Sequence, residues 1–373
     1  MKTWPNRRIL DLLGIELPIV QAPMAGVATS AMAVAVAEAG GLGSLPCAML
    51  APDQIRMEIA AFRRRTTKPL NVNFFCHGLP RKDVAREAAW LQHLRPYYAE
   101  FGLDPTTPVP MITISPFDSA QCELVEEIRP EVVSFHFGLP SRDLIDRVKA
   151  AGARILSSAT TVDEAIWLED HGCEAIIAQG LEAGGHRGMF LSEDISTQVG
   201  TMALVPQVVD AVTAPVIAAG GIGDARGIVA AFSLGASAVQ LGTAYLFCDE
   251  ANVAPIHRLV LRAPQRDHTA ISNIFTGRPA RLVVNRAVRE LGPMSDRVPA
   301  FPRGGASLGA LRAKSESSGS PDFTPLWSGQ AARLGREAAA ADLTRQLAEG
   351  ALAEIAVLRP EASSTKNLTD PAK

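Results

Sequence analysis

Eight short apolar runs recur along the first two thirds of the chain. Most of them are continuous rather than alternating, which is typical of parallel strands that are covered on both faces. They lie at residues 18–25, 42–49, 70–75, 132–137, 154–160, 175–180, 215–221 and 238–245. The pattern therefore predicts eight buried strands.

Helical patterns separate these runs. Several begin at a capping residue and end at a glycine: Ser30 to Gly40, Thr161 to Gly172 and Asp224 to Gly235. Eight strand–helix units within about 250 residues match a (β/α)8 barrel. A doubly wound open sheet would alternate in the same way, but a functional cluster after the last three runs favours closure. We predict an α/β protein with a TIM-type barrel.

The pattern changes after the eighth run. Residues 249–321 do not continue the repeat, so we assign them to a smaller domain that caps the substrate site. Residues 1–248 would form the barrel, closed by a C-terminal segment of about 322–358 that reads as a loop followed by a helix. Between the third and fourth runs, residues 80–103 and 117–129 both look helical.

Composition narrows the class of protein. The 373 residues carry a formal net charge of −3, so no bulk cationic field points to nucleic acid or anionic lipid. No apolar stretch reaches the roughly 18 residues that a membrane span needs. The five cysteines form no CxxC pair, which argues against a zinc site and fits a reducing cytosol. We expect a cytoplasmic protein without metal, either a monomer or a homodimer.

Two glycine-rich loops follow the last two predicted strands. "AAGGIGDARG" (218–227) brings Gly221 and Gly223 to the start of a helix, where backbone N–H groups and the helix N-terminus can face an anion. "QLGTA" (240–244) offers Gly242 for close approach and the Thr243 hydroxyl as a donor. Barrels commonly bind phosphate on these two loops, so the pair predicts a phosphate site.

Other polar or irregular positions fall at the ends of other strands. Asn73 and Gln179 could hold the edge of a ligand ring, and the turn at Pro23 and Met24 would expose backbone to a flat ligand. A flat heterocycle with a phosphate tail satisfies these features together. Flavin mononucleotide fits better than a dinucleotide, because no strand–GxGxxG–helix unit with a downstream acid stands out.

His186 lies among glycines in "QGLEAGGHRGMF" (179–190), after the sixth predicted strand. We expect it on that strand's end, facing the flavin, as the catalytic residue. A near-neutral imidazole could accept a proton from a substrate, or donate a hydrogen bond to an anionic one. Arg187 could add positive potential, although a loop arginine is more often solvated. The role of His77 stays open.

The chain resembles the class I nitronate monooxygenases, formerly called 2-nitropropane dioxygenases. The resemblance rests on stretches between residue 21 and about residue 335: "QAPMAG", "NVNFFCH", "VVSFHFGLP", "QGLEAGGHRG", "AAGGIGD", "QLGTAYLFCDEA", "FTGRPARLVVN" and "SPDFTPLWSGQAARL". It implies a flavin-bearing barrel with a smaller substrate domain. It further implies that flavin mononucleotide and O2 oxidise a nitronate, such as propionate 3-nitronate, to a carbonyl compound and nitrite or nitrate, without metal.

The resemblance also carries over site residues. It makes His186 the active-site histidine, with hydrogen-bond donation to the nitronate as its main task, and places His136 toward the substrate. The predicted cofactor-binding residues are Ala22, Pro23, Met24, Asn73, Gln179, Gly184, Gly185, Gly221, Gly223, Gln240, Leu241, Gly242 and Thr243. The cap departs from the family pattern because few tyrosines precede "SPDF".

Three alternatives remain on the sequence alone. A flavin-dependent enoyl-acyl-carrier-protein reductase shares the barrel, the loops and a histidine, and a nicotinamide–quinone reductase is built on the same scaffold. A non-catalytic phosphate-binding barrel is the third.

Overall fold

A computed structural model of the chain describes residues 4–107 and 114–358. Eight strands in it pair only in parallel, and each lies within one of the eight predicted runs. They are β1 (Ile19–Gln21), β2 (Gly43–Pro46), β3 (Leu70–Phe75), β4 (Val132–His136), β5 (Arg154–Ala159), β6 (Ala175–Gln179), β8 (Val216–Ala219) and β9 (Ala238–Leu241). Nearly all of their residues are buried, as continuous apolar runs require.

The sheet curls into a nearly closed barrel. Its order is β1-β9-β8-β6-β5-β4-β3-β2, and a bridge between Val20 and Leu42 brings the two edges together. Because every strand is parallel, all eight carboxyl ends open on one side of the barrel. The prediction of a TIM-type barrel is confirmed.

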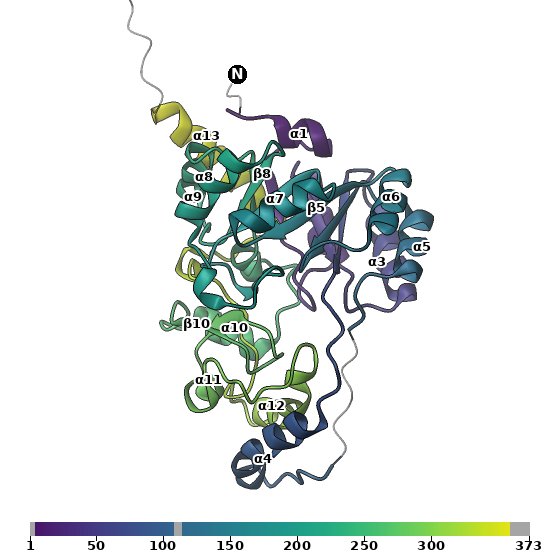
Figure 1. The fold of residues 1–373 in the computed structure, drawn as a ribbon. Coiled ribbons are helices and arrows are strands. Elements are labelled where there is room, and N and C mark those ends of the chain that lie inside the picture. Colours follow the sequence, from purple (N-terminus) through teal and green to yellow (C-terminus); the bar gives the residue numbers. More distant parts are fainter. Residues whose placement is uncertain (1–3, 108–113, 359–373) are drawn as a thin grey trace, which may run out of the picture.

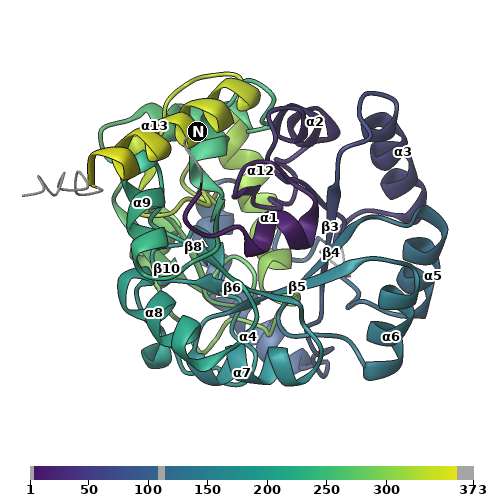
Figure 2. The ribbon, with the colours of Figure 1, turned by 90° about the horizontal axis from the view of Figure 1, so that it is seen from above.

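Helices surround the strands, as the view from above shows (Figure 2). They are α2 (Ser30–Glu38), α3 (Pro52–Arg63), α5 (Ser119–Ile128), α6 (Arg142–Ala150), α7 (Val162–Asp170), α8 (Thr201–Ala211), α9 (Ala225–Ser233) and α13 (Ala340–Leu358). Helix α1 (Arg8–Leu13) lies across one end of the barrel. Thr161 and Asp224 cap α7 and α9 as predicted, but the cap of α2 is Thr29 rather than Ser30, which is already helical.

The closing helix is shorter than the predicted segment. Helix α13 begins at Ala340 and packs against α2 and α9. Residues 322–339 precede it as a loop with one short turn of 3₁₀ helix, η4 (Ala332–Leu334). Part of this loop lines the site described below.

A second group of elements lies beyond the carboxyl ends of the strands (Figure 1). It contains α4 (Val84–Glu100), α10 (Pro255–Arg262), α11 (Arg286–Leu291), η3 (Arg303–Leu308) and α12 (Gly309–Ser317). Its small antiparallel sheet has the order β10-β11-β7, with β10 (Thr269–Ser272), β11 (Ala280–Val283) and β7 (Gly185–His186).

Helix α4 packs with this second group, although the predicted boundary put its residues in the barrel. Trp90, Leu94 and Tyr98 are buried in one apolar cluster with side chains between Ile274 and Phe323. The Tyr98 hydroxyl also donates to the carbonyl of Ser307 at 2.7 Å. The division into residues 1–248 and 249–321 therefore remains a prediction. In the structure, helix α4 belongs with the elements of the cap.

Across residues 4–107 and 114–358, no helix combines the length and the apolar character that crossing a bilayer requires.

Candidate active site

A cavity of about 620 Å³ lies at the carboxyl ends of the barrel strands. The turn after β1, the ends of β3, β4 and β6, and the glycine loops after β8 and β9 form one side of it. Residues 301–312 and 323–329 form the other side. A pocket of this size and mixed lining is typical of a small-molecule or cofactor site.

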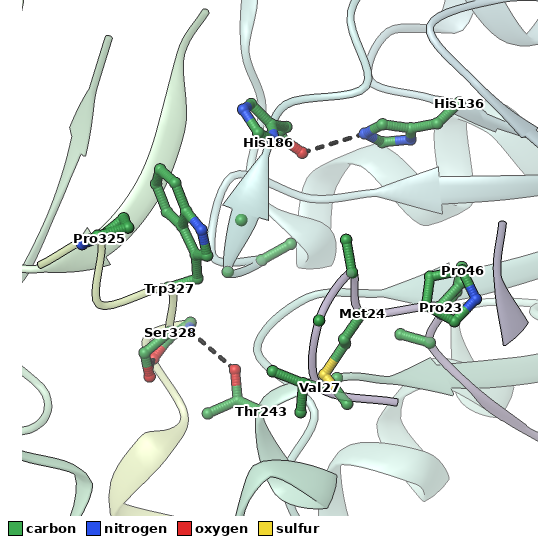
Figure 3. A pocket seen from close by; sticks show the side chains of 18 of the residues that line it. Pro23, Met24, Val27, Pro46, His136, His186, Thr243, Pro325, Trp327 and Ser328 are labelled. Atoms are coloured by element: carbon green, nitrogen blue, oxygen red, sulfur yellow. Dashed lines mark hydrogen bonds between the residues drawn. The ribbon is translucent and has the colours of Figure 1, made fainter. Parts of the chain in front are cut away.

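Most of the predicted site residues meet in this cavity. Those that line it are Ala22, Pro23, Met24, Asn73, His136, Gln179, Gly184, Gly185, His186, Gly221, Gln240, Gly242 and Thr243. Figure 3 shows His186 next to Trp327, with Pro23 and Met24 facing them across the pocket.

Two predicted cofactor-binding residues do not line the cavity. Gly223 is buried on another side of its loop, where an added Cβ would meet Leu334 and Ala331. Leu241 is a core side chain of β9, 1% exposed. Gly221, in contrast, is exposed and has φ 72°, a conformation that suits glycine.

The N-terminus of α9 is not free to hold an anion in the way the sequence suggested. The Asp224 carboxylate accepts from the backbone N–H groups of Arg226 and Gly227. A phosphate at this place would therefore use the loop before the helix, where Gly220 and Gly221 line the cavity, rather than these two helical N–H groups.

His186 lies on β7, not on the end of β6 as expected. It pairs with Ala280 of β11, so the small cap sheet fixes its backbone. Its Nε2 atom is 3.0 Å from the Thr276 hydroxyl, and this is the hydrogen bond that its ring makes among the described residues. Phe301 and Trp327 have their ring centroids 5.5 and 5.4 Å from the imidazole.

Burial and a nearby cation keep His186 neutral. Burial, together with the charges of Arg278 and His77, lowers the pKa of His186 to about 3. Burial also lowers the pKa of the Arg278 guanidinium, to about 10, so this arginine stays charged at neutral pH. The imidazole is thus a neutral hydrogen-bonding group at physiological pH.

His136 also lines the cavity, but both of its ring nitrogens bond to protein. Its Nε2 donates to the His186 carbonyl at 3.3 Å, which leaves Nδ1 to accept from the Ser158 hydroxyl at 2.5 Å. Burial and the neighbouring His186 lower the pKa of His136 to about 3. The ring therefore supports the backbone of His186 in the structure described, rather than offering a free nitrogen to a substrate.

Gln179 and Arg187 hold the loop that carries His186. The Gln179 amide donates to the His186 carbonyl at 3.0 Å and accepts from the Gly188 N–H at 2.7 Å. Arg187 is fully buried rather than solvated, and its guanidinium donates to the carbonyls of Gln179 and Gly180 and to Gln198. Its role is to fasten the loop to the end of β6.

Several polar atoms of the cavity are not used by the protein. Asn73 donates through Nδ2 to Ser134, and its Oδ1 has no partner among the described residues. Oε1 of Gln240 is buried and likewise has no partner in the described part of the chain. Thr243 Oγ1 accepts from the Gly329 N–H at 2.8 Å, so its own proton remains available. A buried acceptor of this kind calls for a donor from a ligand.

His77, whose role the sequence does not indicate, is held by contacts within the protein. Its Nε2 is 3.0 Å from the carbonyl of Ile114, and its ring contacts Phe301 with centroids 4.9 Å apart. Burial lowers its pKa.

Many residues line the cavity without having been predicted, and five of them bear on its chemistry. They are Thr276, Phe301, Arg312, Trp327 and His257. Thr276 and Trp327 belong to the stretches "FTGRPAR" and "PLWSGQ", which signalled the resemblance but gave no local pattern that assigns a role. His257 reads as an ordinary helical histidine, yet it is 7% exposed, and burial lowers its pKa to about 4.

The chain is similar to a family model and to several known proteins. The family model described as "Nitronate monooxygenase" matches residues 6–350. A nitronate monooxygenase of Pseudomonas aeruginosa is 44% identical over 344 residues, which cover 92% of this chain and 98% of that protein. A crystal structure of a nitroalkane oxidase from Streptomyces ansochromogenes is 37% identical, with a TM-score of 0.86, and covers 94% of this chain and 100% of its own. FabK from Thermotoga maritima is 29% identical, with a TM-score of 0.73 and coverage of 96% and 99%.

Proposed function

Because the chain belongs to the nitronate monooxygenase family, a family of oxidoreductases, we propose that it oxidises alkyl nitronates with bound flavin mononucleotide and O2. Propionate 3-nitronate is the representative substrate, and the products are a carbonyl compound with nitrite or nitrate. The observation that carries this proposal is the meeting of a neutral, partly buried histidine and unused polar atoms in one cavity of about 620 Å³.

The cavity residues fit the flavin. The unpaired acceptors Asn73 Oδ1 and Gln240 Oε1 suit N–H groups on a ring edge, and the turn at Pro23 and Met24 offers a flat wall. The loops with Gly221, Gly242 and Thr243 would hold the phosphate through backbone N–H groups and one hydroxyl. Ala22, Gln179, Gly184 and Gly185 also line the cavity.

The chain's own groups would bind and orient the nitronate. The flavin, when bound, supplies the redox chemistry, while the protein orients and shields the reactants. His186 would hydrogen-bond the nitronate through its free Nδ1, beside the apolar walls of Phe301 and Trp327. Since Arg278 favours negative charge nearby, the site suits a substrate that arrives as the anion.

The test is the absorption spectrum of the purified protein, followed by O2 uptake with and without propionate 3-nitronate. We expect a flavin spectrum and nitronate-dependent uptake. A colourless protein, or a flavin that does not respond to nitronate, would overturn the proposal and favour a non-catalytic phosphate-binding barrel.

The flavin-dependent reductases remain the second candidates. NADH or NADPH oxidation with an enoyl thioester, without O2 uptake on nitronate, would indicate the enoyl reductase. Rapid flavin reduction by NADH alone would indicate the quinone reductase. The lower identity of FabK, 29% against 44% for the Pseudomonas protein, supports the nitronate oxidase instead.

A further inference from the structure

His136 and His186 differ in the hydrogen-bond partner of their Nε2 atoms. The partner of His136 Nε2 is a backbone carbonyl, which can only accept, so the proton of His136 is fixed on Nε2. The partner of His186 Nε2 is the hydroxyl of Thr276, which can donate or accept. The tautomer of His186 therefore depends on the direction of one hydroxyl.

From this difference we infer that Thr276 is the positioning residue that keeps the proton of His186 on Nδ1 and directs that N–H to the nitronate. The inference rests on the proposed function, because it names how the same site recognises an anion. It also separates the two tasks open to a neutral imidazole, donation from Nδ1–H and proton abstraction by a bare Nδ1.

The hydrogen bonds of Thr276 permit this arrangement. Its Oγ1 accepts from the Arg278 backbone N–H at 3.3 Å, and the Arg278 carbonyl is also 3.3 Å away. The hydroxyl proton can go to that carbonyl or to His186 Nε2, and the contact with Nε2 is shorter at 3.0 Å. Donation to Nε2 gives a continuous chain from the Arg278 N–H through the hydroxyl to the ring.

A bound anion strengthens this choice. Thr276 occupies Nε2 of His186, so Nδ1 is the ring nitrogen left for substrate among the described contacts. A lone pair on Nδ1 would repel a nitronate oxygen, whereas an N–H would attract it. The same anion is favoured by Arg278, while His77 and His136 stand nearby as neutral rings with lowered pKa values.

The direct test is the ¹⁵N NMR tautomer signature of His186 in the flavin-loaded protein, assigned by comparison with His186→Asn. Nitrate serves as an unreactive planar anion. We expect the Nδ1–H form in the wild-type protein with nitrate bound. Thr276→Val should lose it and raise KM for propionate 3-nitronate about tenfold, the size of one lost hydrogen bond, with a smaller change in kcat. Thr276→Ser should restore both.

Two results would overturn the inference: an Nε2–H ring in the wild-type protein with nitrate, or a Thr276→Val protein with unchanged tautomer and KM. If Thr276→Val does not retain flavin, the wild-type tautomer and the Thr276→Ser protein decide the matter. A wild-type protein without nitronate-dependent O2 uptake would instead contradict the proposed function, whatever the tautomer.

Discussion

The guanidinium of Arg278 lies 4.0 Å above the ring centroid of Phe137, and the same ring is 6.0 Å from the imidazole of His186. Phe137 follows β4 directly and has φ 70°, a left-handed backbone conformation that few side chains adopt. This backbone brings the aromatic ring into contact with a charged group and close to the candidate catalytic histidine. A positive charge is thus held behind the substrate site and does not line it.

Removing this charge should weaken the binding of anions selectively. We expect Arg278→Met to raise KM for propionate 3-nitronate about tenfold, since loss of about 1.4 kcal/mol of charge interaction is a factor of ten. Arg278→Lys keeps the charge and is the matched control. Inhibition by neutral nitroethane should change little in either variant. Equal weakening of anionic and neutral ligands would show that the arginine acts only on the shape of the site.

Replacing the candidate catalytic residue should separate cofactor binding from turnover. His186→Asn is expected to retain flavin while nitronate-dependent O2 uptake falls about 10²-fold, the scale of a lost acid–base or hydrogen-bonding group. Flavin content from the absorption spectrum and O2 uptake measure the two effects. His268→Asn changes an exposed histidine and serves as the control. Wild-type turnover in His186→Asn would remove the residue from the mechanism.

The buried Arg187 should matter for stability more than an exposed arginine does. In Arg187→Met the carbonyls of Gln179 and Gly180 lose their donors, so we expect the free energy of unfolding to fall by about 3 kcal/mol. Arg142 has a side chain that is 73% exposed and pairs with Asp146. Arg142→Met should change the free energy of unfolding by less than about 1 kcal/mol. Urea denaturation compares the two. Similar losses would contradict a fastening role for Arg187.

The buried histidines make stability depend on pH. His136 and His186 have pKa values of about 3 in the folded protein, against 6.5 for an ordinary histidine. Between these values the unfolded chain binds more protons than the folded one, so stability is full above pH 6.5 and falls as the pH drops toward 3. The urea midpoint should therefore be lower at pH 5 than at pH 7.

A single substitution tests the source of this effect. His136→Gln should reduce the difference between the two midpoints, because one of the protonation sites is gone, whereas His268→Gln should leave the difference unchanged. An identical pH dependence in His136→Gln and in the wild-type protein would assign the effect to other groups.

Local sequence patterns are enough to predict the barrel and most of one side of its cavity. A continuous apolar run indicates a strand that is buried on both faces, and it can be recognised from neighbouring residues alone. All eight strands therefore lie where the pattern predicts them. The glycines after β8 and β9 are also a local signal, because they predict backbone close to a ligand. Gly221 and Gly242 do line the cavity. His186 was identified by its glycine neighbours and by the resemblance.

The surroundings of His186 depend on contacts between distant parts of the chain. Its contact with Thr276 joins residues ninety positions apart, and its strand pairs with β11 of the cap. Local patterns also predict a solvated Arg187 and a place for α4 in the barrel. In the structure Arg187 is buried and α4 packs with the cap. Periodicity shows that a side chain is buried but not against which partner, because the partner is set by how distant elements pack together.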